Sequence, residues 1–117
     1  MSTTSARTQL PVLSACSPRA TTALPDEAAT SLASLFKALA DPARVKIMSM
    51  LLNAHEVCAC DVASGISKSA ATTSHHLKLL RAAGLVATDR RGTWIYYRVL
   101  PERLAQLSAA LQITPPA

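Results

Sequence analysis

The chain has 117 residues, which is room for one domain of ordinary size and too little for two. Lys and Arg number 12 against 7 Asp and Glu, so the formal net charge is +5. Three glycines exclude a glycine-rich phosphate loop, and charged residues interrupt every stretch that could approach the ~20 apolar residues of a membrane helix. The abundance of Ala and Leu favours helices over strands, so we expect a small, basic, mainly helical domain with no membrane partner.

The first 24 residues differ in composition from the rest. They are rich in Ser, Thr, Ala and Pro, contain no acid and show no sustained helical or strand period, which predicts a mobile arm. The sequence LSAC ending at Cys16 is similar to the end of a bacterial lipoprotein signal, but the apolar stretch before it is short and contains Pro11. We therefore expect a cytoplasmic protein with an arm over residues 1–24, one domain over residues 25–112 and a disordered tail over residues 113–117.

Four helices are predicted in the first part of the domain. The first begins at about residue 25, and the second begins after Asp41, a good N-cap that is followed by a proline. A short third helix is expected over residues 58–64, closed by Gly65 in the left-handed conformation. Ser69 then caps a fourth helix that ends at about residue 83. Helix, short turn and helix at this spacing indicate a helix-turn-helix.

The hydrophobic period changes from 3.6 to 2 after the fourth helix. Residues 85–89 and 93–99 alternate as strands do, and residues 90–92 form the turn between them. Pro101 opens a final helix. A hairpin directly after the second helix of a helix-turn-helix is a wing. The predicted fold is therefore mainly α with a β-hairpin wing, a winged helix-turn-helix of order α-α-α-α-β-β-α.

The net charge is concentrated in the same region. Residues 66–98 hold six of the twelve basic residues and a single acid, Asp89. A confined basic block on a small helical domain is typical of nucleic-acid binders, although on its own it could equally be a solvated face.

Four segments together resemble the ArsR/SmtB family of metalloregulators. Residues 36–44 (FKALADPAR) are similar to the entry of its second helix, and residues 56–62 (EVCACDV) to its metal-binding box. Residues 74–86 (SHHLKLLRAAGLV) resemble its recognition helix, and residues 91–97 (RGTWIYY) its wing. The resemblance spans about residues 26–112. One departure is Lys68, at a position that is more often apolar in the family.

The resemblance implies a homodimeric repressor that binds double-stranded operator DNA and leaves it when a toxic metal or metalloid binds. Members with Cys-x-Cys in this box sense arsenite, antimonite, cadmium or lead, whereas sensors of zinc, cobalt or nickel often use His and acidic residues of the last helix. The last helix here has no His and one acid, Glu102. We therefore expect the second type of site to be absent and no cofactor to be needed for folding.

The cysteines are the candidate metal ligands: Cys58 and Cys60 as a pair, and Cys16 as a less certain third. Three thiolates without a fourth strong ligand disfavour a closed zinc site and suit As(III) or Sb(III), with Cd(II) or Pb(II) as the alternative. His55 is a possible fourth ligand. A metal-free repressor that responds to thiol oxidation also remains open. An enzyme is not expected, because the sequence lacks a nucleophile motif and paired carboxylates at useful spacing.

The spacing of the pair predicts a mechanism. On a regular helix, residues i and i+2 are about 200° apart around the axis, so their sulfurs face away from each other. Two sulfurs on one ion must converge. We therefore expect ligand binding to distort the start of the third helix, which leads into the recognition helix.

DNA contacts are expected from the start of the recognition helix and from the wing. The first turns of such a helix face base edges, and neighbouring polar and basic side chains hold phosphate. The candidates for base edges are Ala71, Thr72, Ser74 and His75; those for phosphate are Ser69 and Lys78; those at the wing tip are Arg90 and Arg91.

The first and last helices carry leucines that offer a two-fold interface. A homodimer is expected because two-fold proteins read two half-sites about one turn of DNA apart. The candidates are Leu32, Leu35, Leu39, Leu104, Leu107 and Leu111. Each of them could instead belong to the core of one chain.

Overall fold

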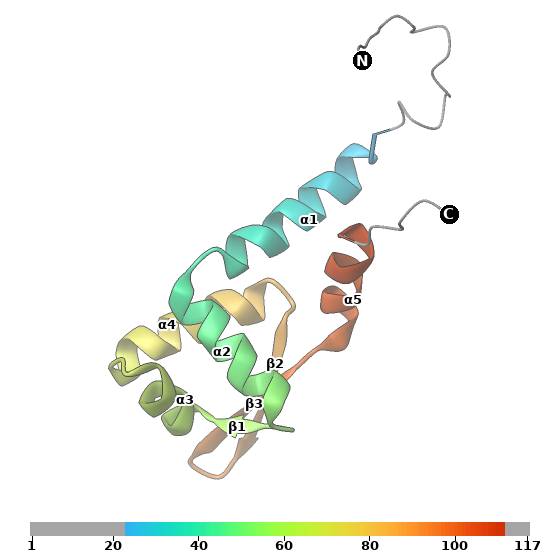
Figure 1. The fold of residues 1–117 in the computed structure, drawn as a ribbon. Coiled ribbons are helices and arrows are strands. Elements are labelled where there is room, and N and C mark those ends of the chain that lie inside the picture. The colour runs from blue at the N-terminus through green and yellow to red at the C-terminus, as the bar shows by residue number, and fades with distance from the viewer. Residues whose placement is uncertain (1–22, 112–117) are drawn as a thin grey trace, which may run out of the picture.

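The computed structural model describes residues 23–111, which form five helices and a three-stranded antiparallel sheet (Figure 1). Most of the predicted arm, and the whole of the predicted tail, lie outside the described residues. No helix of the described part is long and apolar enough to cross a membrane. In chain order the elements are α1 (Asp26–Leu39), α2 (Pro42–Asn53), β1 (Val57–Cys58), α3 (Ala59–Ile66), α4 (Ala70–Ala82), β2 (Val86–Arg91), β3 (Trp94–Val99) and α5 (Pro101–Ala110).

Local capping fixes the starts of α2 and α4 as predicted. Asp41 Oδ1 accepts hydrogen bonds from the backbone N–H groups of Ala43, at 2.8 Å, and Arg44, at 3.4 Å. Ser69 Oγ accepts one from the N–H of Thr72 at 3.1 Å. These bonds satisfy donors that a helix start leaves without a partner.

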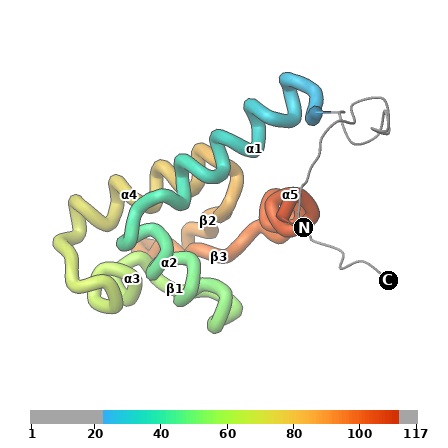
Figure 2. The backbone as a smooth tube through the Cα atoms, turned by 45° about the horizontal axis from the view of Figure 1, so that its top comes forward, coloured from blue at the N-terminus to red at the C-terminus, as the bar shows by residue number. Residues whose placement is uncertain are grey.

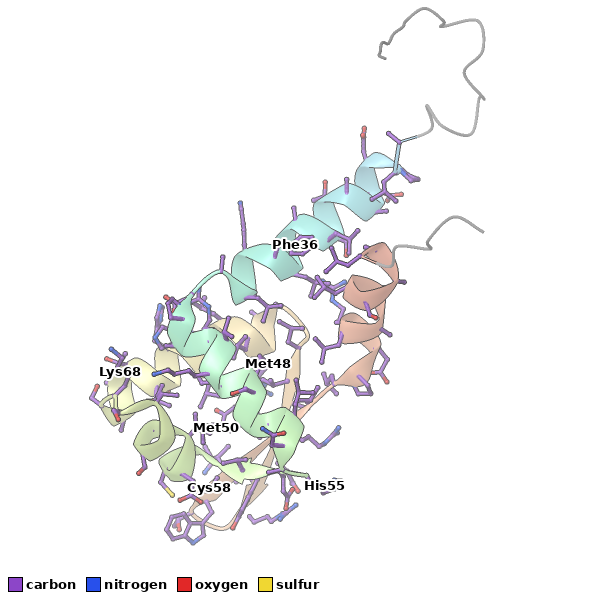
Figure 3. All side chains as sticks on the ribbon, in the orientation of Figure 1. Phe36, Met48, Met50, His55, Cys58 and Lys68 are labelled. Atoms are coloured by element: carbon purple, nitrogen blue, oxygen red, sulfur yellow. The ribbon has the colours of Figure 1, made fainter. Side chains whose placement is uncertain are left out.

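The predicted end of α3 at Gly65 is wrong. The helix continues to Ile66, and the left-handed residue is Ser67, with φ 56°. Gly65 lies inside the helix, where a Cβ atom would stand 2.6 Å from Sδ of Met50 on α2 (Figure 3). The glycine therefore lets α2 and α3 approach closely rather than ending α3.

The sheet contains one strand that the sequence did not predict. Its order is β1-β3-β2, and β1 pairs with β3 through Val57 opposite Tyr97 and Cys58 opposite Tyr96. The hairpin turn is also tighter than expected. Arg91 pairs with Trp94 at the end of the ladder, so Arg90 and Arg91 belong to β2 and not to the turn.

The core lies where α2, α3 and α4 pack with the sheet, and α1 extends away from this cluster (Figure 1). Figure 2 shows α5 beside α1, which it contacts. The largest fully buried side chains are Leu35, Ile47, Val62, Thr73, Leu77, Leu80, Leu85 and Val86.

Leu35 is therefore a core residue and not an interface residue, because a single chain leaves none of it exposed. Four of the other candidate dimer leucines pack partly against the same core: Leu32, Leu39, Leu104 and Leu107. Leu111 is 59% exposed.

Candidate metal site and nucleic-acid interface

The cysteine pair lies at the junction of β1 and α3. Cys58 ends β1 and caps α3 with extended dihedral angles, φ −68° and ψ 144°, and Cys60 is the second residue of the helix. Their Sγ atoms are 3.0 Å apart. Cys58 is 7% exposed, whereas Cys60 is open to solvent.

The geometric premise of the expected distortion of α3 is therefore wrong. The 200° separation holds only when both residues are helical, and Cys58 is not. The two sulfurs already converge, so a thiophilic ion can bridge them without unwinding the helix.

The surroundings of Cys60 favour its protonated form before a ligand binds. The hydrogen bond with Cys58 raises the pKa of Cys60, and desolvation and the nearby Asp61 act in the same direction. A divalent metal binds the thiolate, so its binding must release the Cys60 proton.

The structure brings no further ligand to the pair. Within residues 23–111, no group of three or more His, Cys, Asp or Glu side chains is placed to hold a metal ion. His55 lines a separate hollow with the end of α2 and with Arg98 and Val99, away from Cys58 (Figure 3). The interpretation of His55 as a fourth ligand is not supported. Cys16 lies outside the described residues.

A hollow of about 220 Å³ lies between α3, α4 and β3, next to the pair. Its lining residues are Ala59, Cys60, Ala63, Ala70, Thr73, Ser74, Leu77, Ile95 and Tyr97. Thr73 is 2% exposed, and its Oγ1 is the one buried side-chain oxygen or nitrogen in the described part of the chain that has no hydrogen-bond partner.

An ion pair ties the cysteine segment to the wing. Both carboxylate oxygens of Glu56, two residues before Cys58, accept from the guanidinium of Arg91 on β2, with Nη2 to Oε2 at 2.8 Å. Arg91 also donates to Asp89 at 3.0 Å and lies over the Tyr96 ring, 4.6 Å from its centroid. The hydrogen bond from Arg91 holds the pKa of Glu56 below its ordinary value.

Arg91 thus binds two carboxylates and an aromatic ring within the protein. It would have to give up some of these contacts to bind DNA at the wing tip as predicted. Sequence reasoning missed Glu56. The signal in the sequence was that Glu56 is an acidic residue at the start of the cysteine box, whereas the wing is basic.

The other DNA candidates lie where a recognition helix presents them. On α4, Thr73, Leu77 and Leu80 face the core. The predicted contacts are exposed: Ala71, Thr72, Ser74, His75 and Lys78 on α4, Ser69 at its cap and Arg90 on the wing.

Some polar side chains of α4 and of its cap are also hydrogen-bonded within the protein. The Ser69 hydroxyl donates to Thr72 Oγ1 at 3.0 Å. His76, which was not among the predicted contacts, turns toward α2, where its Nδ1 lies 3.2 Å from Nη1 of Arg44. Arg44 in turn donates to the backbone carbonyl of Ala38 at 2.6 Å. This bridge braces α4 against α2.

Known proteins are similar to this chain in sequence and fold. The family model described as bacterial regulatory protein, arsR family, matches residues 41–88, from the cap of α2 into β2. The arsenic resistance transcriptional regulator of Pseudomonas putida is 32% identical over 80 residues, which cover 68% of this chain and 70% of that protein. The chain belongs to the ArsR family. The resemblance seen in the sequence is confirmed, and the relatives that show the family are named as regulatory proteins and not as enzymes.

Other relatives differ in the resistance that their names give. A cadmium resistance transcriptional regulatory protein of Staphylococcus aureus, a CadC homologue, is 45% identical over 76 residues, which cover 65% of this chain and 63% of that protein. The solution structure of a homodimeric winged helix-turn-helix DNA-binding domain from Mycobacterium bovis matches with a TM-score of 0.63 and 33% identity, over 76% of this chain and 84% of that one. The winged helix-turn-helix fold is thereby confirmed.

Proposed function

We propose that this chain is a repressor that binds double-stranded operator DNA as a homodimer and leaves it when As(III) or Sb(III) binds Cys58 and Cys60. The observation that carries the proposal is the distance of 3.0 Å between the two sulfurs in a regulator of the ArsR family. Soft trivalent ions favour thiolate ligands at low coordination number, and the pair supplies two of them already convergent.

The third ligand of the trivalent ion can come from either of two sources. Cys16 would complete a three-sulfur site; otherwise arsenic keeps one hydroxide from solution. Cd(II) or Pb(II) is the second candidate inducer, because the Staphylococcus aureus relative, at 45% identity, is named for cadmium resistance. Arsenic and antimony are preferred because residues 23–111 bring no third protein ligand to the pair.

The effect on DNA binding follows from what the pair touches. Cys58 is paired with Tyr96 of the wing, and Glu56 holds Arg91 of the same hairpin. A ligand that bonds to both sulfurs sets their spacing anew and so shifts residues 56–58 and, through them, the wing. The ligand need only favour the state that binds DNA weakly, and a typical coupling of about 1–3 kcal/mol lowers operator affinity up to roughly 150-fold.

The DNA-binding and dimer surfaces are supported by exposure. The outward face of α4 carries the contact residues, and the wing adds Arg90. For the dimer, α1, α5 and the residues beside them expose large apolar side chains: Phe36 on α1 at 43%, Leu24 just before α1 at 58% and Leu111 just after α5 at 59%. The same two helices line an apolar hollow with Ala28, Leu32 and Ala109. Such a face is suited to a second copy of the chain. The Mycobacterium bovis domain of the same fold is homodimeric.

The test is release of the protein from a DNA duplex selected out of a random pool. Arsenite, antimonite, cadmium, lead and zinc are compared in one anisotropy assay, with the wild type, the Cys16→Ser variant and the Cys58→Ser/Cys60→Ser double variant. We expect arsenite and antimonite to release the wild type at the lowest concentrations and to leave the double variant bound. Release of the double variant at the same arsenite concentrations would refute the proposal.

The redox alternative is separated in the same assay. Under strong reductant an oxidation-sensitive repressor ignores arsenite, and without reductant it responds to peroxide. The 3.0 Å contact permits either chemistry, so this comparison decides between them.

A further inference from the structure

The hollow beside Cys60 is mainly apolar, and its volume is larger than an inorganic ion bound to the two sulfurs would occupy. Its walls include three alanines of α3 and α4 together with Leu77, Ile95 and Tyr97, and its volume is about 220 Å³. An apolar cavity of about 150 Å³ is enough to hold benzene. The hollow therefore has room for a single aromatic ring.

The hollow also meets the reactive pair. Cys60 is part of the lining, and its Sγ lies 3.0 Å from Sγ of Cys58. An arsenic atom that bridges the two sulfurs sits at the rim. The Thr73 hydroxyl, in the same lining, is buried and has no hydrogen-bond partner.

We propose that the hollow receives the organic substituent of a monosubstituted trivalent arsenical whose arsenic is held by Cys58 and Cys60. This inference rests on the proposed function and names a ligand class for it: arsenicals that carry one aryl or small alkyl group. With two thiols and one carbon substituent, trivalent arsenic is fully coordinated. No third protein ligand is then required, which matches the two cysteines that the described structure brings together.

The binding step balances without an oxidant. Phenylarsine oxide, C6H5AsO, reacts with the two S–H groups to give C6H5As bonded to both sulfurs. Two As–S bonds form, the two thiol protons leave with the oxygen as one water, and arsenic stays trivalent. The carbon–arsenic bond is untouched, so the ring remains attached and enters the hollow.

Occupation of the hollow would act directly on the recognition helix. Ala70, Thr73, Ser74 and Leu77 form its α4 wall. A ring between α3 and α4 pushes against that wall, so the substituent adds a second route to DNA release beside the movement of the wing.

The experiment compares phenylarsine oxide with inorganic arsenite in the operator-release assay. The informative variant is Ala63→Leu, which places a larger side chain in the hollow from α3. The matched control is Ala82→Leu, the same substitution at an exposed position of α4 outside the lining. Phenylarsine oxide has its own preference for dithiols, but this preference cancels because all three proteins keep the same cysteines.

We expect Ala63→Leu to raise the phenylarsine oxide concentration for half-release by at least about tenfold, the scale expected for losing a buried apolar group. Its arsenite concentration should stay within about twofold of the wild type, and Ala82→Leu should change neither. Intact mass spectrometry repeats the comparison without DNA, because the phenylarsenic adduct of Ala63→Leu should be stripped by about tenfold less dithiothreitol.

The outcomes separate this inference from the function on which it rests. If neither arsenical releases the wild type or forms an adduct with the pair, the proposed function fails. If arsenite releases the wild type and Ala63→Leu responds to phenylarsine oxide as the wild type does, only the role of the hollow is overturned.

Discussion

The buried hydroxyl of Thr73 gives a sharp stability prediction. The side chain is 2% exposed, and its Oγ1 has no hydrogen-bond partner. A buried polar group without a partner costs about 1–3 kcal/mol. Thr73→Val replaces that hydroxyl with a methyl group of nearly the same size, and valine and threonine have similar helix propensities. The substitution removes the cost and leaves the packing of α4 intact.

The expected gain lies toward the lower end of that range, because Thr73 borders a hollow and not solid core. We predict that Thr73→Val raises the free energy of unfolding by about 1 kcal/mol, which corresponds to about 4–8 °C in Tm for a domain of this size. Thr73→Ser is the matched control. It keeps the hydroxyl and deletes a buried methyl, so it should lose about 1 kcal/mol.

The assay is urea and thermal unfolding followed by circular dichroism. Protein concentration is held fixed, since dimerisation makes Tm depend on it. A Thr73→Val protein less stable than the wild type would show that the hydroxyl makes a stabilising bond, and the reasoning about this wall of the hollow would be wrong.

Three further predictions concern the cysteine segment and its supports. Glu56→Gln should leave arsenite stoichiometry unchanged while reducing the ratio of operator affinities without and with arsenite, since Arg91 loses its charged partner. Arg91 lowers the pKa of Glu56, so the ion pair contributes its full stability above the ordinary pKa of 4.5. This contribution is lost as the pH falls through the lowered pKa. The difference in unfolding free energy between the wild type and Glu56→Gln, measured in urea titrations, should therefore shrink over that acidic range. Because the pKa of Cys60 is raised, a divalent ion must displace its proton, so apparent Cd(II) affinity should increase between about pH 6 and 8. Arsenite affinity should change little over the same range, because the hydroxyl groups of arsenite leave as water with the thiol protons. A flat cadmium profile would contradict a protonated Cys60 thiol in the free protein. Finally, Gly65→Ala should be more favourable in a Met50→Ala background than in the wild type, by about 0.5 kcal/mol or more in a double-mutant cycle, because the added Cβ no longer meets the Met50 side chain.

Features decided by neighbouring residues were predictable from the sequence. Asp41 and Ser69 cap their helices through amides two or three positions away, so residue type and position were sufficient. Gly84, after α4, adopts a positive φ of 77° as expected of a glycine that closes a helix. The period of 2 in the hairpin likewise located both strands of the wing to within a few residues.

Features decided by distant residues were not predictable. A strand of two residues has no period to detect, and β1 exists because β3 lies beside it, about 40 positions along the chain. The same pairing extends Cys58 and so overturned the argument for a distorted helix. Gly65 follows the same rule, since its contact with Met50 on α2 and not a turn explains the glycine. Residues 56 and 91 are joined across 35 positions, a distance over which pattern reasoning gives no partner.

The two faces of α4 have a consequence for engineering. Thr73, Leu77 and Leu80 point inward, whereas Thr72 and His75 point outward on the same turns. Outward positions can therefore be randomised to retarget the protein to a new promoter without touching the cysteines or the inner packing. With the proposed function, this one scaffold would give a set of biosensors that respond to the same inducer and bind different operator sequences.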